Sequence, residues 1–359
     1  MNMRVLIGLL IISFYGGVTF YLGWGLKQWL VALHIFRFEP LYWIVLFCVS
    51  FGFILGRLHK LLKPLAIAGN YWMFIVQYGL MICLIANIFL LLSPFKSVIW
   101  IGTIGVVLLV VLFVIGTYNA YTPVARELSM QIDKKGQPLR VVVASDFHLG
   151  MLSNKGHLKK FVQKANEAKP DLVLLVGDLI DDDPTWYIED GMHEVMKQLK
   201  TSYGVYGVLG NHEYYGGKIP LLIKEMEASN VRMLVDETIL VANRFYLTGQ
   251  EDRTNKSRKP LESLKPEDED MPWFVMNHTP DDLETPAALG VDFHTSGHTH
   301  KGQMWPNSFI TSRIFELDYG YKRKGTMNAL VSSGFGFWGP PTRIGSQSEI
   351  WVVDIEFIK

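Results

Sequence analysis

The stretch LRVVVASDFH, residues 139–148, joins a run of apolar residues to a polar cluster. Val141–Ala144 is continuously apolar, as is typical of a strand that is buried on both faces of a sheet. The next apolar residues recur at helical spacing, namely Leu158, Phe161, Val162 and Ala165. Leu172–Val176 is a second apolar run of strand length. The order strand, helix, strand predicts an α/β fold class at this point of the chain.

The same alternation continues toward the C-terminus. One helix face is predicted from Ile188, Met192, Val195, Met196 and Leu199, ahead of a strand at 205–209. Further strands are expected at 244–248, 273–277, 291–295 and 350–357. Upstream, Glu127–Ile132 alternates like a strand, and the turn at 134–137 predicts a hairpin that closes onto 139–145. The charged stretch 251–270 is expected to be a solvated loop.

Residues 1–123 differ in composition from the rest of the chain. They hold seven basic residues and one acidic residue, whereas 124–359 hold 27 basic and 33 acidic residues. Four apolar stretches, at about 5–26, 40–58, 68–94 and 97–120, are candidate transmembrane helices, because a helix needs about 20 apolar residues to cross a bilayer. The second stretch only just qualifies. The sequence therefore predicts a transmembrane region at 1–123 and a separate domain at 124–359.

The distribution of Lys and Arg predicts how this region is oriented. With four spans and the N-terminus inside, eight basic residues lie at the inner ends of the spans and three at the outer ends. This bias favours a multi-pass protein of the cell membrane with its C-terminal domain in the cytoplasm. If the second stretch does not cross, the domain lies on the outer face. A cleaved signal peptide over 1–25 fits less well, because the apolar run is long and no small-residue cleavage site follows it.

Composition also disfavours several classes of function. The domain at 124–359 is acidic overall, so no nucleic-acid partner is expected, and the bilayer is the expected partner of the first region. Cys48 and Cys83 are the only cysteines and lie in apolar runs, which excludes a disulfide framework or a cysteine metal site. Because no Asp, Glu, Lys or Arg lies deep in a predicted span, a transporter has no candidate proton relay.

Five polar clusters directly follow predicted strands, where an α/β sheet presents its functional loops. They are Asp146-Phe147-His148, Gly177-Asp178, Gly210-Asn211-His212-Glu213, Asn277-His278 and Gly297-His298-Thr299-His300. Taken singly, each cluster is weak, since a lone Gly-Asp after a strand is usually a turn with a helix cap. Taken together, they supply nitrogen and oxygen donors without sulfur, which favours Mn, Fe, Zn or Co as the metal.

This arrangement resembles the calcineurin-like metallophosphoesterases, and their membrane-associated bacterial members most of all. All five motif blocks are present, and the resemblance covers 124–359. It implies a β-sandwich of two sheets flanked by helices, with two divalent metal ions, either Mn, Fe or Zn. One metal would be bound by Asp146, His148, Asp178 and His300, and the other by Asp178, Asn211, His278 and His298, with Asp178 bridging. Because no ligand is replaced, an inactive homologue is disfavoured.

The resemblance also implies roles in catalysis. Two divalent ions about 3.5–4 Å apart clamp phosphate oxygens and activate a bridging hydroxide for in-line attack. His212 would donate a proton to the leaving oxygen or stabilise the charge of the transition state. Glu213 would orient His212, although Asp is the commoner residue at this place in the family. Gly177, Gly210 and Gly297 would allow the tight turns ahead of the ligands.

Residues outside the motif blocks are less informative. His157 and His193 lie on predicted helices and are expected to be solvated, whereas His294 lies in a strand and is expected to be a core residue or to support a ligand. The run 181–183 of three aspartates either caps the next helix or shapes access to the metals. Arg343 would pair with a phosphate or with a surface acid. Trp338 belongs to a group of aromatic residues that would line a lipid or nucleotide pocket, although burial under loops explains them equally well.

The function that these features favour is a membrane-anchored phosphohydrolase that cleaves a phosphodiester or a pyrophosphate. The leading substrate class is lipid-linked or nucleotide-containing, because tethering removes the diffusion step to a substrate embedded in the bilayer. One alternative is a phosphomonoesterase that acts on a soluble substrate or a phosphoprotein. Another is a membrane scaffold whose metal site is structural. The sequence indicates neither the physiological metal nor the oligomeric state.

Overall fold

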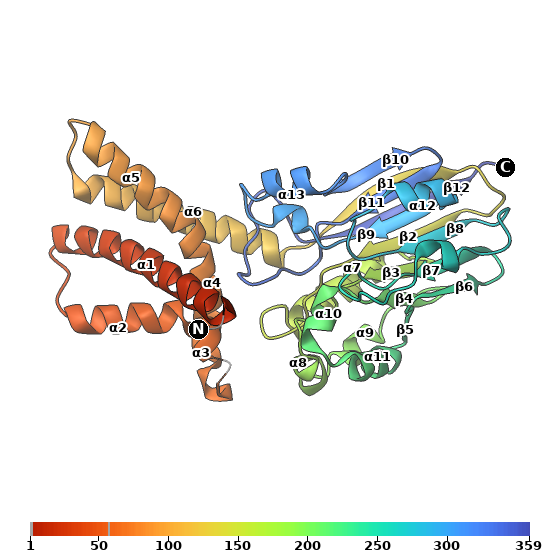
Figure 1. Cartoon of the computed structure of the whole chain (residues 1–359), viewed down its shortest axis with the longest axis horizontal. Coiled ribbons are helices and arrows are strands. Elements are labelled where there is room, and N and C mark those ends of the chain that lie inside the picture. The colour runs from red at the N-terminus through yellow and green to blue at the C-terminus, as the bar shows by residue number, and fades with distance from the viewer. Residues whose placement is uncertain (1–2, 57) are drawn as a thin grey trace. The chain divides into compact units, whose positions relative to one another are not determined.

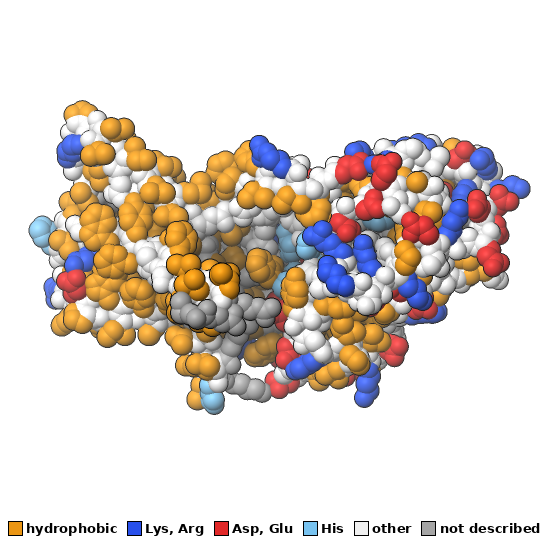
Figure 2. Space-filling view, viewed as in Figure 1, with side chains coloured by type: hydrophobic (Ala, Val, Ile, Leu, Met, Phe, Trp, Pro, Cys, Tyr) orange, Lys and Arg blue, Asp and Glu red, His pale blue; other side chains and the backbone are white. Residues whose placement is uncertain are grey.

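The computed structural model describes residues 3–56 and 58–359. The chain divides into two compact units, one made of Met1–Thr117 with Gly339–Thr342 and the other of Tyr118–Trp338 with Arg343–Lys359. In Figure 2, hydrophobic side chains cover the surface of the first unit, whereas Lys, Arg, Asp and Glu are spread over the surface of the second. The difference in composition between the two parts of the sequence is therefore also a difference between their surfaces.

The first unit is helical. Its elements are α1 (Met3–Ala32), α2 (Glu39–Ser50), α3 (Gly52–Leu55), η1 (Lys60–Leu62), α4 (Lys63–Phe74), η2 (Ile75–Gly79), α5 (Leu80–Leu92) and α6 (Val98–Tyr121). Because η2 is a π-helical turn, α4 and α5 run on as one helix. Within the described residues, three helices are long and apolar enough to cross a membrane: Val5–Ala32, Lys63–Leu92 and Val98–Tyr121.

The second predicted span, 40–58, is not a single helix. The 12 residues of α2 extend over about 18 Å at 1.5 Å per residue, which is less than the hydrocarbon thickness of a bilayer. The helix is interrupted at Phe51, and α3 then packs closely against α4. A Cβ on Gly69 would lie 2.1 Å from the backbone N of Phe53, so only glycine permits this approach. Glycines thus turn the stretch back onto its neighbour, and the number of spans remains a prediction.

The second unit is built on two six-stranded sheets. Their strands, coloured from yellow to blue in Figure 1, follow the orders β1-β12-β2-β3-β4-β5 and β10-β11-β9-β8-β7-β6. The bounds are β1 (Val124–Ile132), β2 (Leu139–Ala144), β3 (Leu172–Val176), β4 (Val205–Val208), β5 (Val231–Met233), β6 (Glu237–Val241), β7 (Phe245–Gly249), β8 (Trp273–Met276), β9 (Phe293–Ser296), β10 (Gly320–Lys324), β11 (Met327–Val331) and β12 (Glu349–Phe357). In the first sheet β2, β3 and β4 run parallel, and in the second β7, β8 and β9 do.

The two sheets face each other across an apolar core, to which Val141 of β2 and Phe274 of β8 both contribute. Helices cover the outer faces: α7 (Lys155–Glu167), α8 (Thr185–Glu189), α9 (His193–Met196), α10 (Asn211–Gly216) and α11 (Ile219–Glu227) belong to the first sheet, and η3 (Leu261–Leu264) and α12 (Glu284–Leu289) to the second. Figure 1 shows the first group, in yellow-green and green, beside β3 and β4. The remaining short helices are η4 (His300–Gly302) and α13 (Ser308–Ile314). The predicted two-sheet sandwich flanked by helices is confirmed.

The predicted hairpin between 127–132 and 139–145 is wrong. β12 lies between β1 and β2, parallel to the first and antiparallel to the second. The burial of the strands explains this order. Residues Glu349–Val353 are buried throughout, which suits a central strand, whereas the first six residues of β1 alternate between partly buried and exposed, which suits an edge strand.

Two further local expectations need correction. The single helix expected at 188–199 is divided into α8 and α9, and the chain between them passes through Gly191 at φ +61°. The stretch 251–270 is only partly a solvated loop, because η3 buries Leu261 and Leu264 against the outer face of the second sheet. In both places the apolar residues still reach a core, and the local geometry of the backbone differs from the prediction.

The histidines outside the motif blocks differ in their surroundings. His157 is buried, which contradicts the expected solvated position, and its ring stacks on Phe335 with the centroids 4.3 Å apart. His193 is partly exposed and lies 3.1 Å from a carboxylate oxygen of Glu194. His294 is buried in β9, as expected of a core residue.

Candidate metal centre

The seven predicted ligands lie together at the ends of five strands. Asp146 and His148 follow β2, Asp178 follows β3, Asn211 follows β4, His278 follows β8, and His298 and His300 follow β9. Because these strands belong to two facing sheets, each sheet contributes ligands to the same cluster. Strand ends are anchored by hydrogen bonds within a sheet, and such rigidity is what holds ligand atoms in a defined geometry.

The backbone at this cluster is unusual. Five of the seven predicted ligands have a positive φ although they carry side chains: Asp146, His148, Asp178, His298 and His300, with φ between 44° and 69°. A left-handed backbone costs free energy for most non-glycine residues, so it persists only where the surrounding structure imposes it. Such residues are concentrated at functional sites, and here they turn the side chains toward one another.

The first group of ligand atoms comes from Asp146, His148 and His300. Nε2 of His148 lies 3.2 Å from Nε2 of His300, and Nε2 of His300 lies 3.3 Å from Oδ1 of Asp146. Two nitrogen ligands at about 2.0–2.1 Å from one metal ion lie about 2.9–3.4 Å apart in octahedral or tetrahedral geometry. The spacing of the two imidazoles therefore suits a shared cation.

The second group comes from Asp178, Asn211, His278 and His298. Nε2 of His278 lies 3.2 Å from Oδ2 of Asp178, and Nδ1 of His298 lies 2.8 Å from Oδ1 of Asn211. The same Oδ2 of Asp178 lies 3.7 Å from Nε2 of His148, which belongs to the first group. Asp178 therefore stands between the two groups of donors.

Unpaired buried atoms show that these residues fit a metal. Nδ1 of His278 lies 2.8 Å from the carbonyl oxygen of Val176, so in the neutral imidazole the proton is on Nδ1 and Nε2 has the lone pair. That Nε2 is buried and has no hydrogen-bond partner. A carbonyl that fixes the tautomer of an imidazole is a recurring feature of metal-binding histidines. The donors are nitrogen and oxygen, as borderline and hard divalent ions require.

The electrostatics of the cluster favour the forms that bind metal for the titratable ligands other than His278, whose pKa is lowered by burial but raised well above its ordinary value by the charges of Asp178 and Asp146. Burial alone would raise the pKa of Asp178, but the charges of the neighbouring histidines, His278 foremost, hold it well below its ordinary value. Burial lowers the pKa of His148 to about 3 and that of His298 to about 4. Burial raises the pKa of Asp146 to about 6, against the opposing charge of His278. At neutral pH the carboxylates are therefore ionised, and His148 and His298 are neutral, as ligands must be.

Glycines let the ligand loops approach closely. A Cβ on Gly210 would lie 2.2 Å from Oδ1 of Asp178, and one on Gly297 would lie 2.4 Å from Oδ2 of Asp146. Gly177 has φ +77° and would place a Cβ against the ring of His278. The three predicted glycines therefore make room for carboxylates and imidazoles.

His212 borders the cluster and is held by an aspartate that the sequence did not single out for this role. Its Nδ1 lies 2.7 Å from Oδ1 of Asp182, and its ring meets the ring of His148 edge-on with the centroids 4.6 Å apart. Although burial lowers the pKa of His212, Asp182 and Asp178 raise it above its ordinary value. Asp183 of the same run accepts a hydrogen bond from the backbone N–H of Thr185 at the start of α8, in line with the capping alternative, and a role of the run in access to the metals stays a prediction.

Glu213 does not orient His212, which corrects the expected role. Its carboxylate accepts four backbone N–H groups: Oε1 those of Leu179 and Ile180, and Oε2 those of Asp178 and Gly210. Burial and the charge of Asp178 raise the pKa of Glu213 to about 7, although these donors favour the carboxylate. Glu213 thus ties the loop after β3 to the loop after β4.

Replacing Glu213 by Gln is expected to lower stability and metal affinity. Whichever oxygen becomes an amide nitrogen, two N–H donors lose their acceptor, at a cost of at least about 2 kcal/mol. Metal affinity should fall by about 10–100-fold, the usual effect of losing a residue that supports ligands. The thermal midpoint and the retained metal would be measured on the purified full chain, with the exposed Glu227→Gln as the control. A midpoint equal to that of the control would contradict this role.

Arg343 is not positioned to contact a substrate, nor does it pair with a surface acid. Its side chain is fully buried, and its guanidinium donates to the carbonyl oxygens of Ser333, Gly334 and Gly336. Nη2 also lies 3.3 Å from Nδ1 of His300. The residue therefore fixes the 333–336 loop beneath a predicted ligand. A buried guanidinium with carbonyl partners over three residues leaves no local pattern in the sequence.

Trp338 is placed differently. Its side chain is 58% exposed, and its ring centroid lies 6.1 Å from that of His212. Its backbone N–H and carbonyl are held by the side-chain amide of Gln303. An exposed indole beside His212 is available to a ligand, so a contact between Trp338 and the substrate stays a prediction.

Residues 139–302, which include all seven predicted ligands, match the family described as calcineurin-like phosphoesterase. The chain is therefore similar to this family over the region that holds the predicted ligands. The predicted resemblance is thereby confirmed. The chain is 31% identical over 237 residues to an uncharacterized metallophosphoesterase of Helicobacter pylori, and this match covers 64% of this chain and 62% of that protein.

Two other relatives extend the comparison. A similar uncharacterized metallophosphoesterase of Aquifex aeolicus is 29% identical over 230 residues, covering 62% of this chain and 87% of the relative. A protein of Bos taurus named transmembrane protein with metallophosphoesterase domain is 28% identical over 279 residues, covering 69% of this chain and 60% of the relative. The chain spans less than two thirds of the length of the Helicobacter and Bos relatives. Together with the three apolar helices, the name of the Bos relative supports membrane association.

Proposed function

We propose that the chain is a membrane-anchored, metal-dependent phosphoesterase that holds two divalent ions and cleaves a phosphodiester or a pyrophosphate. The observation that carries this proposal is the position of Asp178 between two groups of buried His and Asp donors. Asp146, His148 and His300 would hold one ion and Asn211, His278 and His298 the other, with Asp178 shared. Such ions neutralise phosphate oxygens and supply a nucleophile from water at neutral pH. Residues 124–359 are proposed as the catalytic domain and 1–123 as the anchor.

The residues around the ions would share the remaining work. His212 has a raised pKa and is held by Asp182, so it is suited to carry a proton at neutral pH and to deliver it to the leaving oxygen. Glu213 would keep the loops after β3 and β4 in place, since it binds their backbone N–H groups, and Arg343 would fix the 333–336 loop beside His300. Trp338 would contact the organic part of the substrate.

The membrane unit favours the proposal that the substrate lies in the bilayer. A domain tethered beside the bilayer meets membrane-embedded molecules at high effective concentration, because the search is confined to a surface. The proposed substrate is therefore a phosphodiester or pyrophosphate with a lipid part.

The reaction is tested with the full chain purified in detergent and supplied with Mn²⁺. Nitrophenol release is expected from bis-p-nitrophenyl phosphate at a higher rate than from p-nitrophenyl phosphate, and a chelator should abolish both. Faster turnover of the monoester would contradict the diester assignment. Metal bound without turnover of these compounds, of lipid phosphodiesters or of pyrophosphates would contradict the enzymatic function.

The proposed location of the catalytic domain is the cytoplasmic face of the cell membrane. If only the three long helices cross, the segment 33–62 and the catalytic domain share one side, and the N-terminus and the segment 93–97 share the other. The first side then carries Arg37, Arg57 and Lys60 in its loop, whereas the second carries Arg4 and Lys96. Positive charge therefore favours a cytoplasmic domain for three spans as well, with the N-terminus then outside, and this replaces the expectation that three spans place the domain on the outer face.

Protease protection tests this orientation. In right-side-out vesicles the domain at 124–359 is expected to resist added protease and to be digested once the vesicles are opened. Digestion of intact vesicles would place the domain outside.

A further inference from the structure

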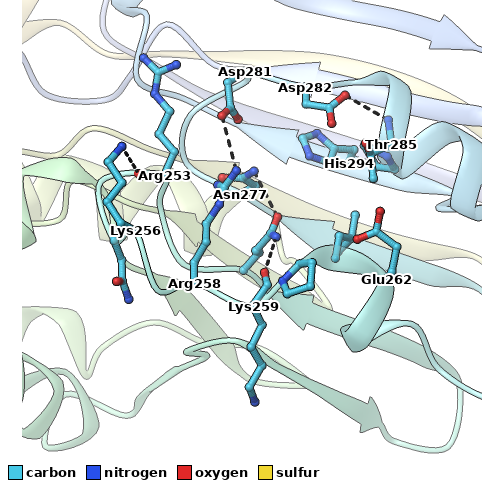
Figure 3. A pocket seen from close by; sticks show the side chains of 15 residues that line it. Arg253, Lys256, Arg258, Lys259, Glu262, Asn277, Asp281, Asp282, Thr285 and His294 are labelled. Carbon is cyan, nitrogen blue, oxygen red and sulfur yellow. Dashed lines mark hydrogen bonds and ion pairs between the residues drawn. The ribbon is translucent and has the colours of Figure 1, made fainter.

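A polar cavity in the second unit has no role in the proposed chemistry so far. Its volume is about 450 Å³, within the range of small-ligand sites. It lies over the outer face of the second sheet, between the 250–262 segment and the start of α12. Figure 3 shows the lining side chains, with Asn277 and His294 rising from the sheet and Arg258 reaching toward Asp281.

Two buried polar atoms in this cavity lack partners. The side chain of His294 is 1% exposed and that of Asn277 is 5% exposed. Nδ1 of His294 and Oδ1 of Asn277 have no hydrogen-bond partner. The amide nitrogen of Asn277 is already used, since it donates to Gln250 over 3.4 Å. Leaving a buried polar atom unpaired costs free energy, so these two atoms indicate a polar group that is bound there.

Basic side chains border the same cavity. Arg253 and Lys256 are exposed and lie on the 250–262 segment, and Arg258 is partly exposed. Arg258 forms an ion pair with Asp281, with Nη2 and Oδ2 3.5 Å apart. The carboxylate of Asp282 accepts hydrogen bonds from the backbone N–H groups of Glu284 and Thr285. The ammonium of Lys256 donates to the carbonyl oxygen of Arg253, which neutralises no charge. Lys259 and Glu262 also line the cavity, so its border holds four basic and three acidic side chains, a small excess of positive charge that favours an anion.

The cavity adjoins the metal centre through the chain itself. Asn277 on its floor is bonded directly to His278, a predicted ligand. On the 250–262 segment, Asp252 accepts a hydrogen bond from the hydroxyl of Thr279, one residue beyond His278.

We propose that this cavity binds the hydroxyl-bearing head group of the phosphoryl substrate, a polyol or sugar phosphate. Oδ1 of Asn277 accepts a hydrogen bond that a hydroxyl supplies and an ionised phosphate oxygen cannot supply. Neutral His294 exchanges a hydrogen bond with a second hydroxyl, and Arg253 and Lys256 bind the phosphoryl oxygens. A nucleobase fits less well, because no aromatic ring other than that of His294 lines the cavity among the residues that the structure describes. This assignment rests on the proposed function and names its substrate class.

A kinetic experiment tests the site through substrate choice. His294→Leu is expected to raise the KM for the p-nitrophenyl phosphodiester of glycerol about tenfold, the usual effect of losing one hydrogen bond. The variant should leave the KM for bis-p-nitrophenyl phosphate, which has no hydroxyl, unchanged. Lys256→Ala, an exposed substitution that leaves the fold intact, removes a charge that attracts the phosphoryl group of either substrate, so it should raise both KM values, whereas the exposed Lys224→Ala should raise neither. Equal effects of His294→Leu on the two substrates, or no effect on either, would overturn the proposal.

A binding experiment separates this proposal from the proposed reaction. Calorimetry on the metal-stripped full chain should show glycerol 3-phosphate or glucose 1-phosphate bound at least tenfold more tightly than inorganic phosphate, and less tightly in His294→Leu and Lys256→Ala. If this holds while no diester is turned over, the reaction is refuted and the site stands. Equal affinity for inorganic phosphate, or no binding of either sugar or polyol phosphate, would refute the site. If short-chain phosphatidylglycerol competes for the cavity, the head group belongs to a lipid. If it does not compete, the head group belongs to a soluble molecule.

Discussion

Replacing Asp178 by Asn is expected to abolish turnover and to release most of the bound metal. Its carboxylate lies within 3.7 Å of His148 and 3.2 Å of His278, so both predicted metal positions lose an anionic ligand at once. Removing a mere supporting residue already costs about 10–100-fold in metal affinity, and a shared ligand should cost at least the upper value. Metal content after desalting would be measured beside nitrophenol release.

A neighbouring carboxylate provides the control for this variant. Asp190 is exposed, so Asp190→Asn makes the same chemical change away from the ligands and should retain both metal and activity. Asn has nearly the shape of Asp, which keeps the packing of the buried site. Full metal content in Asp178→Asn would show that the carboxylate is not shared between two ions.

His212→Ala is expected to lower turnover by about 10²–10⁴, the usual contribution of a positioned acid or base, without loss of metal. The size of the loss should depend on the leaving group. An alkoxide needs a proton to depart, whereas nitrophenolate leaves readily without one. The decrease should therefore be greater for glycerophosphoglycerol than for bis-p-nitrophenyl phosphate, and both would be compared under saturating metal.

Two further variants test whether the loss of turnover comes from the removal of the His212 imidazole. Asp182→Asn should give a smaller loss with the same dependence on the leaving group, because Asp182 acts through His212. His193→Ala, a change to a partly exposed histidine on α9, should behave like the wild type. An equal loss on both substrates in His212→Ala would indicate that the imidazole stabilises charge and does not transfer a proton.

The predicted ligands could be found from the sequence because each follows its strand within a few residues. Val141–Ala144 and Leu172–Val176 are apolar runs that identify strands, and Asp146 and Asp178 come directly after them. Such a pattern needs no knowledge of distant contacts, since parallel strands end at the same edge of a sheet. Because this pattern is local in the sequence, the predicted bounds of β3 agree with the structure to the residue.

The features that escaped prediction depend on residues that are far apart in the sequence. Asp182 reaches His212 across 30 residues and Arg343 reaches His300 across 43, and neither pair has a characteristic spacing. The position of β12 between β1 and β2 also escaped prediction, because the hydrophobic patterns of these strands do not say which strand pairs with which. The orphaned atoms of Asn277 and His294 exist only once β8 and β9 lie side by side.

The origin of the ligands in both sheets has a consequence for the life of the protein in the cell. Ions bound there would act as a cross-link between Asp146 and Asp178 of the first sheet and His278 and His298 of the second. A bound ion at 100 times its dissociation constant stabilises the folded state by about 2.7 kcal/mol, and this gain vanishes when the metal is scarce. Starvation for metal would therefore expose the domain to quality-control proteases, so the abundance of the protein would follow the metal supply.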